Sequence, residues 1–201
     1  MSIATKTGDS GNTGLLFGVR VSKADLRIYA VGDVDELCAA LGLIKPLLHP
    51  NDPTLGPLVY ILSNIQQKLT LLMGELSTES EHLDTYVNKY GSINEEHLTN
   101  LETDLYTLEA AVPKQKDWVL YGATVLGAQA DFASKVCRRA ERAMCRLDYH
   151  KERTLVYKYI NRLSDYLHLL ARWFDNATAN LSPEEENEET PNTQENEQQP
   201  E

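Results

Sequence analysis

Ten residues near the N-terminus combine hydroxyls, glycines and a lysine in a way that suits phosphate binding. The segment is Thr5-Lys6-Thr7-Gly8-Asp9-Ser10-Gly11-Asn12-Thr13-Gly14. Closely spaced backbone N–H groups can surround an anion, hydroxyls add donors, and a lysine adds positive charge. The Gly-Lys-Ser/Thr ending of a Walker loop is missing, and Arg20 stands where an EF-hand loop needs a bidentate Glu. The segment is therefore either a phosphate-binding loop or a plain surface loop, because Gly and Thr clusters also mark loops.

A second candidate is the run Cys137-Arg138-Arg139-Ala140-Glu141-Arg142, which lies in a stretch of helical periodicity. Arg138 and Arg142 fall one turn apart on one face of a helix, and Glu141 can reach back to Arg138. Two guanidinium groups so placed suit bidentate recognition of phosphate. A solvated charged face is the alternative, since such charge pairs are common on exposed helices.

The third candidate is Asn161-Arg162-Leu163-Ser164-Asp165, where three mediocre helix formers stand within five residues. A wet helix face, a buried polar network and a ligand contact would each explain them.

The five His are scattered and show no HExxH spacing, so we expect no zinc held by protein ligands and assign no metal-binding residues.

Helices must position these residues, because five segments carry apolar side chains at helical spacing. Asp33 and Glu36 resemble a capping box at the start of the first segment, and Pro46 is expected to kink or end it. Ser92 and Glu95 are expected to cap the third segment, residues 79–91 are expected to form a loop, and residues 4–23 show no sustained periodicity. The pattern predicts an all-α bundle of five helices. The helices are expected at about residues 33–48, 58–76, 92–113, 125–147 and 155–174.

Chain length and charge indicate one domain with a tail. The net charge of −11 includes eight Glu after Ser182, without which it would be about −3. Residues 182–201 contain too few apolar side chains to fold, so we expect a disordered acidic tail. The remaining chain divides into a loop segment, residues 1–24, and a helical domain, residues 25–181. Nothing forms the basic patch that a nucleic-acid partner would require.

The cysteines and the hydropathy of the sequence indicate the cellular compartment of the protein. Cys38, Cys137 and Cys145 are odd in number and widely spaced, which fits a reducing compartment. No stretch approaches the ~18 to 20 apolar residues that span a bilayer, and the first eight residues are polar. We therefore expect a cytoplasmic protein without a membrane partner.

Taken together and in this order, the motifs resemble those of PduO-type ATP:cob(I)alamin (corrinoid) adenosyltransferases. The resemblance rests on residues 5–11, 18–23, 32–37, 137–142 and 159–167, which read TKTGDSG, GVRVSK, GDVDEL, CRRAER and YINRLSDYL. The family implies a ferritin-like five-helix bundle, a homotrimer, and active sites between subunits. It also implies that MgATP and a reduced cobalamin are bound, and that the 5′-deoxyadenosyl group passes from ATP to Co(I) with release of triphosphate. A reductase or an adenosylcobalamin-dependent acceptor enzyme would be a further partner.

By this resemblance, the nucleotide is bound by the N-terminal loop and by two of the helices. Trp118, Asp35 and Arg138 are implied in catalysis. The implied nucleotide-binding residues are Thr5, Lys6, Thr7, Gly8, Asp9, Thr13, Gly14, Lys23, Arg138, Arg139, Glu141, Arg142 and Asn161. Fixed positive charge at a triphosphate leaving group fits the chemistry, because negative charge develops there.

The corrinoid side departs from the family pattern. Relatives commonly read Phe-x-x-Pro-Gly-Gly, with the Phe beneath the corrin ring, whereas this chain has Trp118, Tyr121 and Ala123 at the Phe, Pro and second Gly positions. Relatives also carry an Arg that pairs across the subunit interface with the position of Asp35, and here that Arg is Ser134. A Trp before a helix is also often a core anchor. The alternative function is a non-catalytic, ATP-binding helical trimer that has lost corrinoid chemistry.

Overall fold

The computed structural model describes residues 4, 6–114, 118–147 and 153–179. A hairpin of two short strands, β1 (Asn12–Gly14) and β2 (Arg20–Ser22), precedes the helices. Short 3-10 turns occur at Leu16–Gly18, Lys45–Leu47 and Ser80–His82. Thr5 and the predicted acidic tail lie outside the described residues. The helices are α1 (Leu26–Ile44), α2 (Gly56–Leu76), α3 (Leu83–Tyr90), α4 (Glu95–Ala111), α5 (Val125–Cys145) and α6 (Thr154–Ala179).

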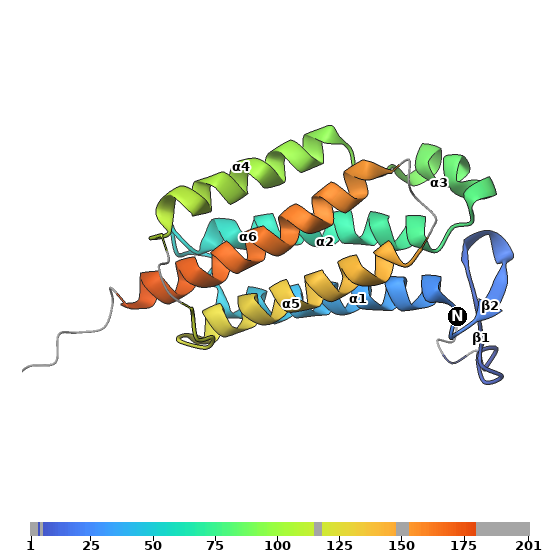
Figure 1. Ribbon diagram of the computed structural model, residues 1–201, viewed down its shortest axis with the longest axis horizontal. Coiled ribbons are helices and arrows are strands. Elements are labelled where there is room, and N and C mark those ends of the chain that lie inside the picture. Colours follow the sequence, from blue (N-terminus) through green and yellow to red (C-terminus); the bar gives the residue numbers. More distant parts are fainter. Residues whose placement is uncertain (1–3, 5, 115–117, 148–152, 180–201) are drawn as a thin grey trace, which may run out of the picture.

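The five long helices pack side by side along one axis, as Figure 1 shows. The pairs in close contact are α2 with α1, α1 with α5, α5 with α6, and α6 with α4. The hairpin lies beyond the first turn of α1, at the end of the bundle opposite the start of α5 (Figure 1). None of the described helices is long and apolar enough to cross a membrane.

The core is built from the apolar stripes that the sequence predicts. These side chains are almost wholly removed from water, and each buried Leu or Phe contributes roughly 1.5–3 kcal/mol. Examples from four helices are Leu37, Leu41, Leu62, Leu69, Leu105, Leu163, Leu170 and Phe174. The mostly helical fold is thus confirmed, and the predicted helix at residues 58–76 agrees with α2 to within two residues.

The predicted start of the first helix is wrong. Asp25 is the N-cap of α1, and its carboxylate accepts a 2.8 Å hydrogen bond from the backbone N–H of Arg27. Asp33 and Glu36 lie two turns farther along, where they pair with a side chain of α5 instead of capping a helix. Of the two effects expected of Pro46, the structure shows the end of the helix: α1 stops at Ile44, and Pro46 stands in the 3-10 turn that follows.

Two further expectations need correction. Residues 79–91 contain α3, so the described residues form six α-helices where the sequence predicted five. Tyr86 is the buried side chain of α3, and its hydroxyl donates to the carbonyl of Leu71 at 3.1 Å. At the next helix the capping pair is Asn94 and His97, not Ser92 and Glu95.

Candidate functional site

The N-terminal loop forms a tight turn closed by its own backbone. The N–H of Asp9 donates to the carbonyl of Lys6, and the N–H of Lys23 donates to the carbonyl of Gly11 at 2.8 Å. A side chain at Gly8 would come within 3.1 Å of the Lys23 ammonium nitrogen, so Lys23 lies over the turn. Lys6 is exposed. The loop therefore brings two exposed ammonium groups and several hydroxyls to one turn, as phosphate binding requires.

Arg20 and the hairpin hold this turn against the bundle. Arg20 donates through Nη2 to the carbonyl of Thr7 at 2.8 Å, and β1 pairs with β2 in antiparallel register, Thr13 opposite Val21. The backbone N–H of Leu16 donates to the carbonyl of Ser77 at 2.9 Å. The hairpin is thus fixed to the C-terminal end of α2, and the candidate phosphate loop is a built element.

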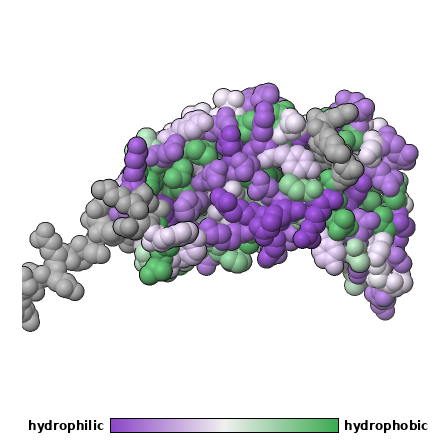
Figure 2. All heavy atoms as spheres, viewed as in Figure 1, coloured by the Kyte–Doolittle hydropathy of each residue, from purple (hydrophilic) through white to green (hydrophobic). Residues whose placement is uncertain are grey.

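The exposed faces of α5 and α6 bring three predicted nucleotide-binding residues together. Arg138 pairs with Asp165 at 3.2 Å, and Asn161 donates to Glu141 at 3.2 Å. The sequence suggested that Arg138 pairs with Glu141 of its own helix. In the structure Arg138 pairs instead with Asp165 of α6. About half of the Arg138 side chain is exposed, so its guanidinium can turn toward a ligand. The surface over α5 and α6 is largely hydrophilic in Figure 2.

Arg139 and Arg142 differ in their surroundings. Arg139 turns toward α1, where its guanidinium pairs with Asp33 at 3.1 Å and also with Glu36. A hydrogen bond with Glu36 is the main cause that raises the pKa of Arg139. Arg142 is exposed in the last turn of α5, one turn beyond Arg138. Arg142 thus continues the Arg138 face, whereas Arg139 links α5 to α1.

Ser134, which stands where the family has Arg, and Asp35, which keeps the family Asp, are both accommodated in the single chain. Ser134 is fully buried, and its hydroxyl donates to the carbonyl of Ser164 at 3.0 Å. Asp35 is exposed on α1. Because a carboxylate open to water is hydrated, Asp35 carries no desolvation cost in one chain.

Trp118 is fully exposed, so the reading of this residue as a core anchor is wrong. Leu120, Tyr121 and Val125 are also exposed, by 61 to 90% of their surface, at the same end of the bundle. Such a cluster of large apolar groups on a surface commonly marks a binding site. The four residues fall within eight positions of the chain, at and just before the start of α5.

A buried set of charges was missed from the sequence. Asp131 of α5 pairs with Arg172 of α6, and Arg172 also pairs with Asp175 at 3.1 Å. Asp131 and Arg172 are each only 3% exposed. Burial raises the pKa of Asp131, while the nearby Arg172 opposes that rise. The signal in the sequence was the presence of charged residues beside Ala130 and Ala171, within otherwise apolar helical stripes.

The candidate residues do not meet at one place in one chain. The 21 residues of α5 span ~30 Å, and Trp118 precedes its first residue, whereas the N-terminal turn lies at the opposite end of the bundle (Figure 1). Arg138 lies 13 residues, ~20 Å, from the start of α5. One copy therefore does not bring the phosphate loop and Trp118 together in a single site.

Across the described part of the chain, no three His, Cys, Asp or Glu side chains are grouped so that they could hold a metal ion.

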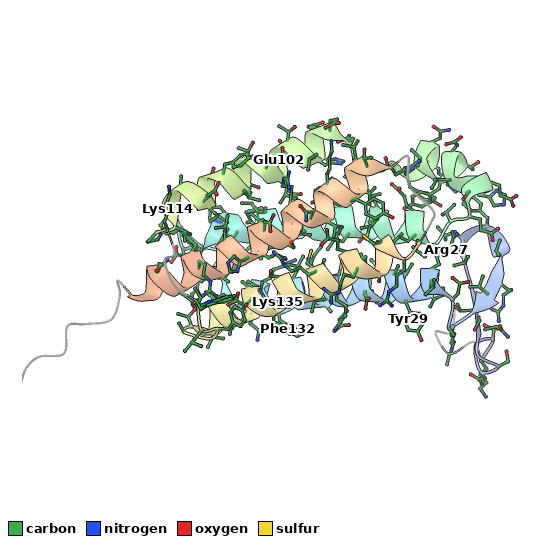
Figure 3. The ribbon with its side chains drawn as sticks, in the orientation of Figure 1. Arg27, Tyr29, Glu102, Lys114, Phe132 and Lys135 are labelled. Carbon is green, nitrogen blue, oxygen red and sulfur yellow. The ribbon has the colours of Figure 1, made fainter. Side chains whose placement is uncertain are left out.

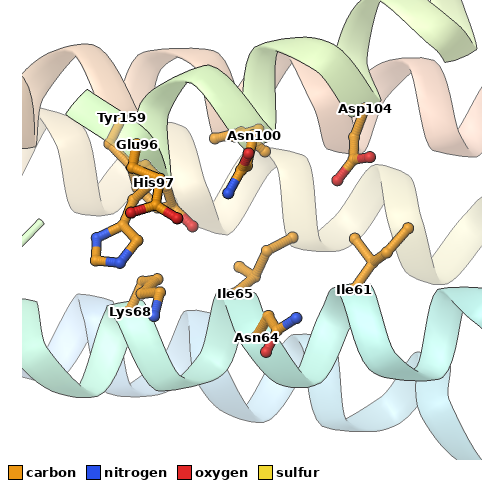
Figure 4. Close-up of a pocket in the computed structure, with 10 residues that line it drawn as sticks. Ile61, Asn64, Ile65, Lys68, Glu96, His97, Asn100, Asp104 and Tyr159 are labelled. Carbon is orange, nitrogen blue, oxygen red and sulfur yellow. The ribbon is translucent and has the colours of Figure 1, made fainter. Parts of the chain in front are cut away.

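A separate crevice lies between α2 and α4 (Figure 4). It has a volume of about 260 Å³, an apolar floor that includes Ile61 and Ile65, and polar walls with Lys68, His97 and Asp104. None of the sequence-predicted site residues lines this crevice.

Comparison with known proteins identifies relatives that match most of the chain. The family model described as "Cobalamin adenosyltransferase" matches residues 3–174. A cobalamin adenosyltransferase of Cupriavidus metallidurans is 39% identical over 87% of this chain and 89% of its own length. A corrinoid adenosyltransferase of Bacillus subtilis is 37% identical over 86% of both chains. The match to PduO of Citrobacter freundii, 38% identical, spans 49% of that longer protein.

Solved structures agree with these matches. A variant PduO-type ATP:corrinoid adenosyltransferase from Lactobacillus reuteri, complexed with cobalamin and ATP, superposes with a TM-score of 0.78 at 30% identity. The superposition covers 89% of this chain and 96% of that one. Another variant of that enzyme, complexed with ATP, gives a TM-score of 0.77.

Proposed function

Because the chain belongs to the cobalamin adenosyltransferase family, we propose that it transfers the 5′-deoxyadenosyl group of ATP to the Co(I) of a reduced corrinoid. The electron pair of Co(I) attacks the ribose 5′ carbon, a cobalt–carbon bond forms, and the bond from that carbon to oxygen breaks. Triphosphate leaves with the bonding electrons. The observation that carries the proposal is the meeting of Arg138, Glu141 and Asn161 on one exposed face.

Charge on the protein would stabilise the leaving group. Negative charge develops on the triphosphate as the bond breaks, and fixed guanidinium and ammonium groups lower the energy of that state. Arg138 and Arg142 would supply this charge from α5, and Lys6 and Lys23 from the N-terminal turn. Asn161 and Glu141 would hold polar groups of the nucleoside. Mg²⁺ would be bound mainly by the phosphate oxygens, as is usual for nucleotide sites.

The exposed apolar end of the bundle would receive the corrinoid. Trp118 would lie beneath the ring at the place of the family Phe, where it limits access of the lower axial ligand to cobalt. Its full exposure supports this role, because the ring is free to contact a partner. A change at Trp118 should therefore alter turnover more than folding.

We also propose a homotrimer. Separation of the phosphate loop and Trp118 within one chain is explained if different copies contribute them to one site. Exposed apolar side chains on α1 and α5 support this assembly: Tyr29 is 58% exposed and Phe132 is 49% exposed, and both lie along one edge of the bundle (Figure 3). Exposed groups of this kind are typical of subunit interfaces. We place the protein in the cytoplasm, where a reductase would supply Co(I) and an acceptor enzyme would take the product.

Adenosylation of chemically reduced cobalamin tests the function directly. Loss of the Co(I) absorbance should depend on ATP, and Trp118→Ala should slow it while leaving the melting temperature and ATP affinity nearly unchanged. Trp118→Phe should retain turnover. Binding of ATP without any adenosylation would favour the non-catalytic trimer. Sedimentation should give three copies, and a fully active monomer would refute the shared site.

A further inference from the structure

The buried charges at the start of α5 are connected to the loop that carries Trp118. Asp175 accepts two hydrogen bonds from Thr124 through one carboxylate oxygen, from the backbone N–H at 3.1 Å and from the hydroxyl at 3.0 Å. The Thr124 hydroxyl oxygen in turn accepts from the N–H of Gly127 at 2.9 Å, and so caps α5. Asp175 also pairs with Arg172. The last residue of the loop is therefore fixed to α6.

Tyr121 fixes a second point of the loop to the same charges. Its ring lies over the guanidinium of Arg172, 5.9 Å from the ring centre, and over the ammonium of Lys135 at 4.8 Å. Cations attract the face of an aromatic ring, and the attraction grows when the cation is buried. Arg172 is buried, whereas Lys135 is exposed. The loop is held at its end by Thr124 and three residues earlier by Tyr121.

Gly127 lets α5 pack closely against this anchor, by which we mean the contacts of Thr124 and Tyr121 with Asp175 and Arg172. A side chain at Gly127 would come within 2.0 Å of the Asp175 carboxylate oxygen and 2.9 Å of the Thr124 hydroxyl. The helix can approach Asp175 this closely because Gly127 has no side chain.

A buried ion pair is an inefficient source of stability, because desolvation offsets much of its attraction and an apolar pair of similar size often stabilises as well. The charges of Asp131, Arg172 and Asp175 instead fix the positions of the groups around them. Arg172 has fixed directions for its donors, and Asp131 and Asp175 occupy them from two helices. An apolar side chain could fill the space but could not attract the face of Tyr121 or orient Asp175.

We propose that Arg172 is a positioning residue for corrinoid chemistry. Through its contacts with Tyr121 and Asp175, Arg172 holds the loop of residues 118–124 in place. The inference rests on the proposed function in one respect, the contact of Trp118 with the corrinoid. It also accounts for a departure of this chain from the family pattern. Where relatives commonly have Pro, this chain has Tyr121, whose ring gives the loop an attachment that Pro lacks.

Variants at the surface end of the anchor test the proposal without emptying the core. Tyr121→Leu removes the aromatic face, and Thr124→Val removes the hydroxyl while keeping the shape of the side chain. Each should lower kcat/KM for reduced cobalamin by about 2- to 10-fold, in line with the loss of one cation–π contact or one hydrogen bond. ATP affinity should stay within about twofold. Thr124→Ser, which keeps the hydroxyl, should restore the corrinoid kinetics.

Fluorescence anisotropy supplies a readout that does not depend on activity. In a Trp173→Phe background Trp118 is the sole tryptophan, and Tyr121→Leu and Thr124→Val should both lower its anisotropy. Unchanged anisotropy and unchanged corrinoid kinetics in these folded variants would overturn the proposal. So would an equal loss of ATP affinity, corrinoid kinetics and melting temperature, which would indicate a purely structural role. If the wild-type protein does not adenosylate cobalamin, the proposed function fails, while the anisotropy still decides whether the anchor exists.

Discussion

Replacement of Arg138 by Ala separates a nucleotide-binding role from a structural one. In the free chain Arg138 pairs with Asp165 at 3.2 Å, and the two side chains are 49% and 45% exposed. Ion pairs this exposed contribute about 0–1 kcal/mol to stability. The substitution also places a good helix former in α5. The melting temperature of Arg138→Ala should therefore stay close to that of the wild-type protein.

Nucleotide affinity should change far more. If Arg138 makes a charge-assisted hydrogen bond to a phosphate, its loss costs about 1.5–3 kcal/mol, which weakens ATP binding about 13- to 160-fold. Part of the bonding energy is spent in releasing Asp165, so we expect the lower half of this range. The same loss should appear in kcat/KM for ATP, since the contact persists in the transition state.

Calorimetry of ATP binding provides the measurement, with Arg146→Ala as the matched control. Arg146 is exposed at the C-cap of α5, about two turns beyond Arg138. The substitution Arg146→Ala therefore removes the same charge from the same helix. Its replacement should change ATP affinity by less than about threefold, because a screened charge contributes little at a distance. Equal affinities for wild-type protein and Arg138→Ala would remove Arg138 from the site, and equal losses in both variants would reduce its role to long-range attraction.

Three further predictions concern the rest of the chain. Gly74→Ala should destabilise the protein by about 1–3 kcal/mol in denaturant unfolding, because the added carbon would meet the Tyr86 hydroxyl at 1.9 Å, whereas Gly42→Ala has only an ordinary contact at 3.8 Å and should be neutral or stabilising by up to about 1 kcal/mol. Equal effects of the two would show that α3 does not pack as described. At pH 8 a thiol reagent should label the exposed Cys145 quickly and Cys38 slowly, since burial raises the pKa of Cys38 to about 11. As the pH rises from about 9 to 11, the free energy of unfolding should fall, because the Cys38 thiol loses its proton in the unfolded chain before it does so in the folded chain. Rapid labelling of two thiols per folded chain would contradict this. Deletion of the acidic tail should leave ATP affinity within about twofold by calorimetry, and a large loss would mean that the tail contacts the site.

Helical periodicity was sufficient to predict the long helices, because core packing demands apolar residues on one face of each. It failed where local signals conflicted. Asp33 and Glu36 have the spacing of a capping box, yet their carboxylates serve Arg139 of α5. The helix α3 has one buried side chain, Tyr86, and therefore no stripe to detect. The strands of the hairpin are three residues each, too short for alternation.

The candidate site was predictable in its parts and not in its arrangement. The charged motif on α5 and Asn161 on α6 were identified from residue types, and the structure brings Arg138, Glu141 and Asn161 to one face. Exposure of Trp118 could not be deduced, because the same Trp fits a core equally well. Asp131 and Arg172 were missed because a buried pair depends on two helices meeting, which one segment does not encode.

The N-terminal turn and the loop that carries Trp118 lie at opposite ends of the bundle, which has a consequence for mixtures of defective chains. In a ring of copies, a site that takes its turn from one chain and its Trp118 from a neighbour is intact whenever those two contributions are sound, whatever else the chains carry. A chain with a damaged turn and a chain with a damaged loop, each inactive alone, would complement one another. Random assembly of equal amounts would leave about one quarter of the sites whole. Recovery of activity when the two defective proteins exchange subunits would thus show that the turn and the loop of one chain serve different sites.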